Sequence, residues 1–361
     1  MLKFVDEYKD TDLCLKIAEE IRNISKKKMN IMEVCGGHTM AIRKNGIHKL
    51  IGENIKLVSG PGCPVCVTSE EDINNVIALC EIDGTAVCTF GDLFYVPGTN
   101  SSLAEKKAEG ADVRVVYSVD EVLNFAKEER NKKFIFISIG FETTAPCIAA
   151  AILQAEKEGL NNFYILCLNK TMPNALKSIL IDRHSKIDAL ICPGHVTAIT
   201  GIDMYKSIPT EAGISCCVSG FEPLDILTSI YILAELYQKD EVGLVNAYKR
   251  VVRDEGNKKA QFIMSEVFEK CDASWRGIGI ISSSGLKLNE TYERFSAEKN
   301  FEIKAARVKM VKGCICGDIL SGLKNPADCV LFGKVCTPSV PKGACMVSSE
   351  GACAAWYKYG E

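Results

Sequence analysis

Residues 31–39 read Ile-Met-Glu-Val-Cys-Gly-Gly-His-Thr, and residues 55–66 read Ile-Lys-Leu-Val-Ser-Gly-Pro-Gly-Cys-Pro-Val-Cys. In each stretch a short apolar run ends in a turn of glycine, cysteine and other small residues. Such runs are typical of buried strands, and the carboxyl ends of parallel strands line the ligand crevice of an α/β sheet. The two stretches therefore predict neighbouring strands whose special loops lie together at one edge of a sheet.

The same alternation of short apolar runs and helix-period stretches continues along most of the chain. Since βαβ crossovers enforce parallel pairing, it predicts an α/β fold with two similar, mostly parallel βα domains facing a common cleft, and a third, metal-dependent domain. Strands are expected at residues 31–34, 55–58, 85–89, 113–117, 134–139, 163–168, 189–192 and 214–218, and helices at 10–27, 70–79, 119–129, 143–158, 173–181 and 223–237.

The expected division has four parts. Residues 1–29 form an N-terminal helical segment, and residues 30–130 form the α/β domain with the Cys35/His38 and Cys63/Cys66 loops. Residues 131–236 form the second α/β domain. Residues 237–361 are helical and then irregular, and the last fifty of them could not build a core from apolar burial without a metal group or disulfide.

Charge and hydropathy exclude some classes of function. Lys and Arg number 43 against 46 Asp and Glu, a net charge of −3, so no overall basic field favours nucleic acid or an anionic membrane. No apolar run approaches the roughly 18 residues of a membrane span, and the first residues lack the apolar block of a signal peptide. We expect a cytoplasmic protein with no nucleic-acid or membrane partner.

Cysteine is the unusual residue, with 18 in 361, or about 5%. Reduced cysteines in such numbers indicate metal or redox chemistry more often than packing. Six of them lie in the last fifty residues: Cys314, Cys316, Cys329, Cys336, Cys345 and Cys353. One tetrahedral zinc ion or one [4Fe–4S] cluster uses four thiolates, so the economical division is four ligands and a separate dithiol pair. The spacing alone leaves structural zinc open.

Cys35-Gly-Gly-His38 places a thiol and an imidazole at a strand-to-helix junction, where a helix N-terminus is expected to lower the thiol pKa. Cys63-Pro-Val-Cys66 is a C-x2-C motif that is typical of a redox pair or half of a zinc site. If both loops meet, three thiols and one imidazole converge on one soft metal. The alternatives are a Cys–His dyad of a hydrolase and a merely buried thiol.

Other polar residues at the predicted turns have two interpretations. Glu142, Glu222 and Glu350 are either acid/base groups in the cleft or helix N-cap partners, and His195 is a second candidate cleft histidine. His48 and His184 are predicted at the surface. No G-x4-G-K-[ST] motif is present, so nucleotide binding is not supported.

The motifs together resemble the hydrogenase maturation factor HypD family. The resemblance covers about residue 32 to the last residues, in order, and rests on Met32-Glu-Val-Cys-Gly-Gly-His-Thr-Met40, Gly60-Pro-Gly-Cys-Pro-Val-Cys66, Thr89-Phe-Gly-Asp-Leu93, Ser138-Ile-Gly-Phe-Glu-Thr-Thr-Ala-Pro146, Cys192-Pro-Gly-His195, Ser219-Gly-Phe-Glu-Pro223 and the run from Cys314 to Cys353.

The resemblance implies a scaffold on which, with HypC in a stable complex, the Fe(CN)2(CO) unit of [NiFe] hydrogenase is assembled, with cyanide accepted transiently from HypE. It implies a third domain with a [4Fe–4S] cluster held by Cys314, Cys329, Cys336 and Cys353, and a redox pair, Cys316 and Cys345, beside it. Cys35 is then the soft ligand of transient Fe(II) carrying CN and CO, and His38 relays a proton or orients the diatomic ligands. Glu350 belongs to the same set of candidate catalytic residues.

Release of cyanide from an S-bound thiocyanate takes two electrons, so Cys63/Cys66, exchanging with Cys316/Cys345 and finally with the cluster, form a plausible thiol relay. A rival interpretation is an iron–sulfur disulfide reductase of the ferredoxin–thioredoxin reductase type, which leaves Cys35 and His38 without a role. A zinc-stabilised binding module is the third.

Overall fold

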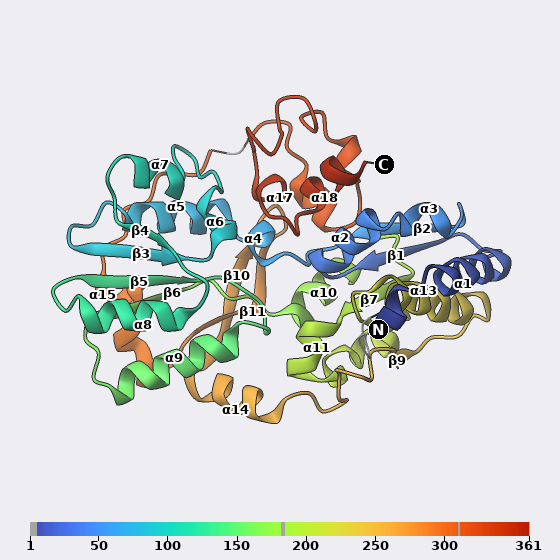
Figure 1. Cartoon of the computed structure of the whole chain (residues 1–361), viewed down its shortest axis with the longest axis horizontal. Helices are drawn as coiled ribbons and strands as arrows, with labels where there is room; N and C mark the ends of the chain where they lie inside the picture. The colour runs from blue at the N-terminus through green and yellow to red at the C-terminus, as the bar shows by residue number, and fades with distance from the viewer. Residues whose placement is uncertain (1–5, 182–184, 310, 361) are drawn as a thin grey trace.

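The computed structural model describes residues 6–181, 185–309 and 311–360. Two parallel sheets form the two lobes seen in Figure 1. The first has the order β2-β1-β7-β8-β9 and the second the order β4-β3-β5-β6. The strands are β1 (Met29–Glu33), β2 (Ile55–Ser59), β3 (Thr85–Thr89), β4 (Val113–Val115), β5 (Lys133–Ser138), β6 (Phe163–Cys167), β7 (Ala189–Pro193), β8 (Ser215–Ser219) and β9 (Leu244–Asn246). The predicted α/β class with two parallel βα domains is confirmed.

The strand partners differ from the expected division of the chain. β4 and β5 lie on opposite sides of the expected boundary at residue 130, yet both pair with β3 in one sheet. β1 pairs with β7, more than 150 residues further along the chain. The boundaries at 130 and 236 are therefore wrong: the chain leaves the first lobe after β2, builds the second lobe, and returns at β7. Apolar periodicity identifies strands but not their partners.

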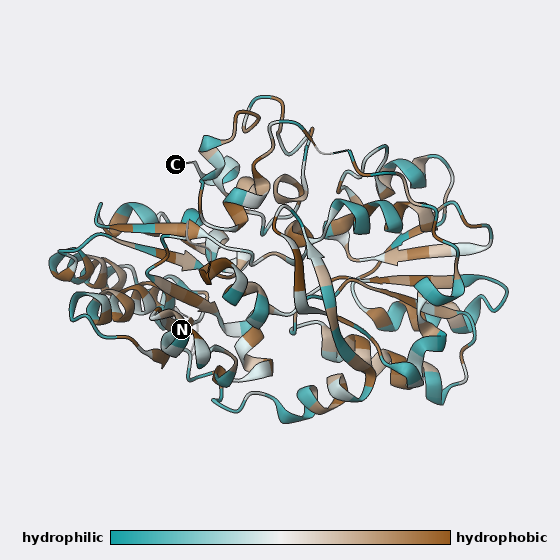
Figure 2. Cartoon of the chain, turned by 180° about the vertical axis from the view of Figure 1, so that it is seen from behind, coloured by the Kyte–Doolittle hydropathy of each residue, from teal (hydrophilic) through white to brown (hydrophobic). Residues whose placement is uncertain are grey.

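The first lobe is covered by helices with apolar faces. α1 (Thr11–Ile24) starts where the Asp10 carboxylate accepts a bond from the Leu13 amide, and it turns Ala18 and Ile21 inward. It packs against α13 (Pro223–Gln238), which lies on β8. Figure 2 shows hydrophobic colour along the strands and the helix faces that touch them.

The second lobe is built in the same way around β5. α8 (Val119–Glu128) begins with a capping box between Ser118 and Glu121 and packs, with α9 (Ala145–Lys157), over Phe134 and Phe136. The remaining helices are α2 (Gly36–Lys44), α3 (Ile47–Leu50), α4 (Pro64–Val67), α5 (Glu70–Leu79), α6 (Gly91–Phe94), α7 (Leu103–Ala108), α10 (Met172–Ile181), α11 (Gly194–Thr200), α12 (Ser207–Ala212), α14 (Lys258–Val267), α15 (Ala297–Asn300), α16 (Cys316–Leu320), α17 (Ala344–Val347) and α18 (Ala352–Tyr359), with 3-10 turns at η1 (Asp6–Lys9), η2 (Ile202–Tyr205), η3 (Glu290–Phe295) and η4 (Pro326–Asp328).

An antiparallel hairpin, β10 (Phe268–Trp275) and β11 (Gly279–Leu288), stands between the lobes in Figure 1. The sequence analysis expected residues 237–361 to be helical and then irregular, so this hairpin was not predicted. Isolated β-bridges connect the hairpin to two crossover segments. Thr68, just after α4, pairs with Trp275, and Lys170, just after β6, pairs with Gly285. Residues 237–246 also depart from the expected third domain, since β9 completes the first sheet. The cysteine-rich part is the smaller segment 311–360, which caps the top of the molecule in Figure 1.

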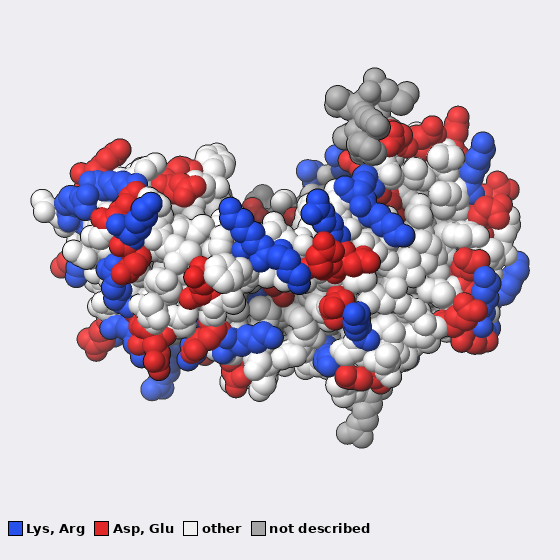
Figure 3. Space-filling model, turned by 90° about the horizontal axis from the view of Figure 1, so that it is seen from below, with Lys and Arg blue, Asp and Glu red and all other residues white. Residues whose placement is uncertain are grey.

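Positive and negative side chains are interspersed over the face shown in Figure 3. In the described ranges, no helix combines the length and the apolar character that a membrane crossing requires.

Candidate functional site

A cleft of about 310 Å³ lies between the lobes and is lined by the loops that follow β1, β3, β5 and β7. The predicted common cleft is therefore present. Its polar and sulfur-bearing side chains come from both lobes and from the C-terminal segment: Cys35, Asp92, Thr143, Thr144, His195 and Glu350.

Cys35 follows β1 and is the N-cap residue of α2, with extended backbone. The pKa of this thiol is raised to about 12, mainly by burial and further by the Glu350 carboxylate, against two opposing bonds from backbone amides. The expectation of a lowered pKa is wrong, because desolvation outweighs the helix N-terminus. At neutral pH this thiol is therefore protonated.

His38 is the third residue of α2 and is fully buried. Its Nε2 is 2.9 Å from the Gly220 carbonyl, which can only accept, so Nε2 carries the proton and Nδ1 has no partner among the described residues. Burial lowers its pKa to about 4, so the ring is neutral. Phe221 stacks between His38 and His195, at 4.5 and 4.0 Å between ring centroids. His195, not His38, therefore presents an imidazole to the cleft.

Cys63 and Cys66 form a disulfide across the turn that starts α4. Both are buried, and Pro64 and Val65 between them line the cleft. The preceding residue, Gly62, touches the Cys35 loop, because its carbonyl accepts a bond of 3.2 Å from the Gly36 amide. The two predicted loops are thus in direct contact.

Gly62→Ala tests this contact. A Cβ at residue 62 would lie 2.3 Å from the Cys35 Cα and 2.4 Å from its nitrogen, so one loop has to move. We expect the free energy of unfolding to fall by about 1–3 kcal/mol, measured by urea denaturation. Gly243→Ala is the control, since its Cβ would meet Leu236 at an ordinary 3.5 Å. Equal stability of the two variants would contradict the close packing of the loops.

Glu350 lies beside Cys35, and the Cβ that Gly36 lacks would meet its carbonyl oxygen at 2.4 Å. Burial and the nearby Asp92 carboxylate raise the pKa of Glu350. Asp92 also accepts a bond of 3.1 Å from the Ser348 hydroxyl. Asp92 belongs to a motif quoted above but received no role from the sequence, because only the fold brings it to the cleft.

Glu142 and Glu222 have structural positions. The Glu142 carboxylate is buried and accepts a 3.0 Å bond from the Met172 amide at the start of α10. Glu222 is the N-cap residue of α13 and pairs with Lys9 at 3.6 Å. The N-cap interpretation fits both. Among the histidines predicted at the surface, His48 is half-buried in α3, and His184 lies outside the described residues.

Burial raises the pKa of Glu142 to about 7 from 4.5, against the opposing effects of the Met172 amide and Lys270. The folded state therefore holds a proton that the unfolded chain has released, and stability falls as pH rises from about 4.5 to 7. Glu142→Gln keeps the carbonyl acceptor and removes the titration. Its stability relative to the parent should improve by up to ~3 kcal/mol between pH 5 and pH 7.5, measured by denaturant unfolding at both pH values. An unchanged difference would show that Glu142 does not carry this proton.

The six C-terminal cysteines surround one small cavity together with Ile319, Leu331, Phe332 and Met346. The sulfur atoms of Cys316 and Cys345 are 2.9 Å apart and buried. The pKa of Cys316 is raised by its bond to Cys345 and by burial, and Arg276 opposes the rise. Burial and the neighbouring thiols raise the pKa of Cys314 to about 11. Within the described ranges, no three His, Cys, Asp or Glu side chains are close enough to hold a single metal ion.

The C-terminal segment reaches the disulfide through helix contacts. α17, which carries Cys345, packs against α4, which carries Cys66, and α18 packs against α2. All four paired cysteines, Cys63, Cys66, Cys316 and Cys345, belong to one buried cluster.

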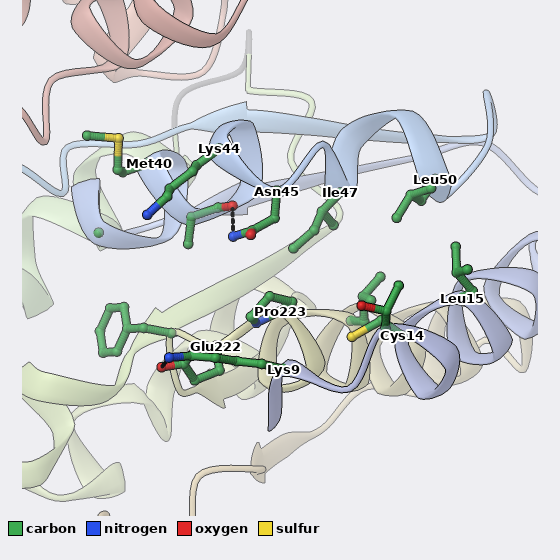
Figure 4. Close-up of a pocket in the computed structure, with 15 residues that line it drawn as sticks. Lys9, Cys14, Leu15, Met40, Lys44, Asn45, Ile47, Leu50, Glu222 and Pro223 are labelled. Atoms are coloured by element: carbon green, nitrogen blue, oxygen red, sulfur yellow. Dashed lines mark hydrogen bonds and ion pairs between the residues drawn. The ribbon is translucent and has the colours of Figure 1, made fainter. Parts of the chain in front are cut away.

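A second hollow, of about 620 Å³, lies between α1 and the facing helices α2 and α3. Figure 4 shows Met40 and Lys44 on one side of it and Lys9 and Glu222 on the other. Phe221 lines it, and the same ring stacks on His195, so this ring separates the hollow from the cleft. This hollow was not predicted from the sequence.

The comparisons with known proteins agree over nearly the whole chain. Residues 12–360 match the HypD family model, described as "Hydrogenase formation hypA family". A Methanocaldococcus jannaschii protein named for hydrogenase expression and formation is 44% identical over 352 residues, or 97% of this chain and 98% of that protein. Hydrogenase maturation factor HypD of Escherichia coli is 41% identical over 366 residues (99% and 98%), and that of Rhodobacter capsulatus is 39% identical over 371 residues (99% and 98%). The chain belongs to the HypD family of hydrogenase maturation factors.

Proposed function

We propose that this chain is a scaffold for the Fe(CN)2(CO) unit of [NiFe] hydrogenase, working with a HypC partner in a stable complex and receiving cyanide from HypE. The observation that carries the proposal is the cleft in which Cys35, Asp92, His195 and Glu350 meet beside the Cys63–Cys66 disulfide. It offers one soft thiol ligand and a few polar groups in a largely buried site, as assembly of a low-spin iron unit requires.

The Cys35 thiol is the proposed ligand of the iron cargo. Its raised pKa disfavours a free thiolate, and bound Fe(II) would reverse this by supplying positive charge. Glu350 and Asp92, which line the same cleft, are placed to accept the released proton. His38 holds Gly220 and Phe221 in place, and His195 is the imidazole available to cargo.

One dithiol supplies the two electrons that release of cyanide from an S-bound thiocyanate requires. A thiolate of the reduced Cys63/Cys66 pair attacks the thiocyanate sulfur, cyanide leaves, and a mixed disulfide forms. The second thiolate then releases the carrier as a thiol and closes the Cys63–Cys66 disulfide, which is the state of the pair in this structure. The dithiol supplies both electrons.

We propose that the C-terminal cavity holds a [4Fe–4S] cluster, with Cys314, Cys329, Cys336 and Cys353 as its ligands. The four thiols surround a space instead of meeting at one point. A zinc ion with Zn–S bonds of about 2.3 Å would need its four sulfurs about 3.8 Å apart. A bound cluster would supply single electrons to the neighbouring Cys316/Cys345 pair.

The test is anaerobic co-expression with HypC, followed by analysis of the purified complex. We expect a stable complex with iron and sulfide in about equal amounts, near four each per chain, and broad visible absorption. Zinc without sulfide would favour a zinc-stabilised binding module. Turnover of protein disulfides that persists in Cys35→Ser would favour a disulfide reductase.

A further inference from the structure

The turn of the central hairpin, Trp275-Arg276-Gly277, joins two segments that both carry paired cysteines. On one side, Trp275 forms a bridge with Thr68, and the Arg276 amide donates to the Val67 carbonyl at 2.8 Å. These partners directly follow Cys66. Figure 1 shows the hairpin next to α4.

The Arg276 side chain strengthens this junction. Its Nε donates to the Thr68 carbonyl at 2.8 Å, and its Nη1 donates to the Glu70 carboxylate at 3.2 Å. The residue is only 7% exposed, and its Nη2 is buried with no partner in the described part of the chain. A buried guanidinium that spans a backbone carbonyl and a carboxylate fixes the geometry of both.

On the other side, the turn touches the helix that begins at Cys316. A Cβ on Gly277 would lie 2.5 Å from the Gly317 Cα, and a Cβ on Gly317 would lie 2.3 Å from the Gly277 carbonyl oxygen. Both residues have to be glycine for this approach. Arg276, Cys314 and Cys316 also line one cavity of about 360 Å³.

We propose that Arg276 is a positioning residue that clamps the Cys63–Cys66 turn to the helix of Cys316, so that the two cysteine pairs can exchange disulfides. This rests on the proposed function, which needs the pairs to exchange. The helix that carries Cys66, α4, also packs directly against the helix that carries Cys345, α17.

The exchange balances within the chain. The Cys345 thiolate attacks the Cys66 sulfur, the Cys66–Cys345 bond forms, and Cys63 leaves as a thiolate. The Cys316 thiolate then attacks Cys345, the Cys316–Cys345 bond forms, and Cys66 leaves. Two electrons pass to the Cys63/Cys66 pair, and the two protons lost by Cys316 and Cys345 are taken up there.

The test uses the full chain with Cys63→Ser and Cys316→Ser, which leaves Cys66 and Cys345 as the only members of the two pairs. Anaerobic equilibration in a glutathione redox buffer, followed by differential alkylation and peptide mass spectrometry, gives the effective concentration of one thiol at the other. Adding Arg276→Gln should lower this value about tenfold or more. Arg294→Gln, which alters a distant pair with Glu156, should leave it unchanged.

Each outcome decides one point. An unchanged effective concentration with Arg276→Gln would overturn the role of Arg276 and leave the relay intact. Absence of the Cys66–Cys345 disulfide even with Arg276 present would overturn the relay, and this inference with it. If Arg276→Gln does not fold, the test is repeated with Glu70→Gln, which removes only the carboxylate that pairs with the Arg276 guanidinium. A lowered effective concentration in this variant supports the clamp, and an unchanged effective concentration overturns it.

Discussion

Cys329→Ala is expected to lose most of the iron and sulfide of the chain, and to loosen residues 311–360. Cys329 is one of four thiols around the C-terminal cavity, and this segment has few large buried side chains of its own. Ligand binding therefore carries much of its folding free energy. Iron and sulfide analysis should show less than about half of the parent content, and hydrogen exchange in the segment should become fast.

Cys316→Ala is the matched variant. Cys316 lines the same cavity but pairs with Cys345 at 2.9 Å, so its loss should leave iron and sulfide near the parent level while maturation stops. Equal loss of the cluster in both variants would contradict the division into four ligands and one redox pair.

Cys35→Ser is expected to abolish binding of the iron cargo without unfolding the protein. The hydroxyl is nearly isosteric with the thiol, but it is a hard and largely protonated ligand, unsuited to low-spin Fe(II). The variant should keep its C-terminal iron and its HypC partner, yet show no cyanide or carbonyl infrared bands.

Cys80→Ser is the control for damage to packing. Cys80 is the C-cap residue of α5, its sulfur lies 3.9 Å from the Val76 carbonyl oxygen, it packs against the main hydrophobic cluster, and burial raises its pKa as it does that of Cys35. We expect Cys80→Ser to show the cyanide and carbonyl infrared bands at the intensity of the parent protein. Loss of the bands in both variants would show that the effect is general and would remove the case for Cys35.

The sequence predicted the elements of the fold more completely than their arrangement. β3 and α5 begin and end at the predicted residues, because each has strong periodicity and, for α5, a serine N-cap. The pairing of β1 with β7 was not predictable, since both lobes have similar strands and the chain returns to the first sheet after a long excursion. The β10–β11 hairpin was missed because its burial depends on two crossover segments.

The candidate site was predicted in part for the same reason. Cys35, the Cys63/Cys66 loop and Glu350 meet as expected, since their motifs lie at strand ends or in the cysteine-rich segment. The burial of individual side chains could not be predicted from the sequence. Burial raises the pKa of the Cys35 thiol, and His38 lies buried behind Phe221. Asp92 and Arg276 could not be given roles, because single charged residues acquire them only from their neighbours in space.

The most direct measurement is infrared spectroscopy of the chain co-purified anaerobically with HypC from cells that are maturing hydrogenase. The scaffold account predicts cyanide and carbonyl stretching bands that disappear in Cys35→Ser and persist in Cys80→Ser. A complex with its full cluster, isolated under those conditions without these bands, would contradict the account.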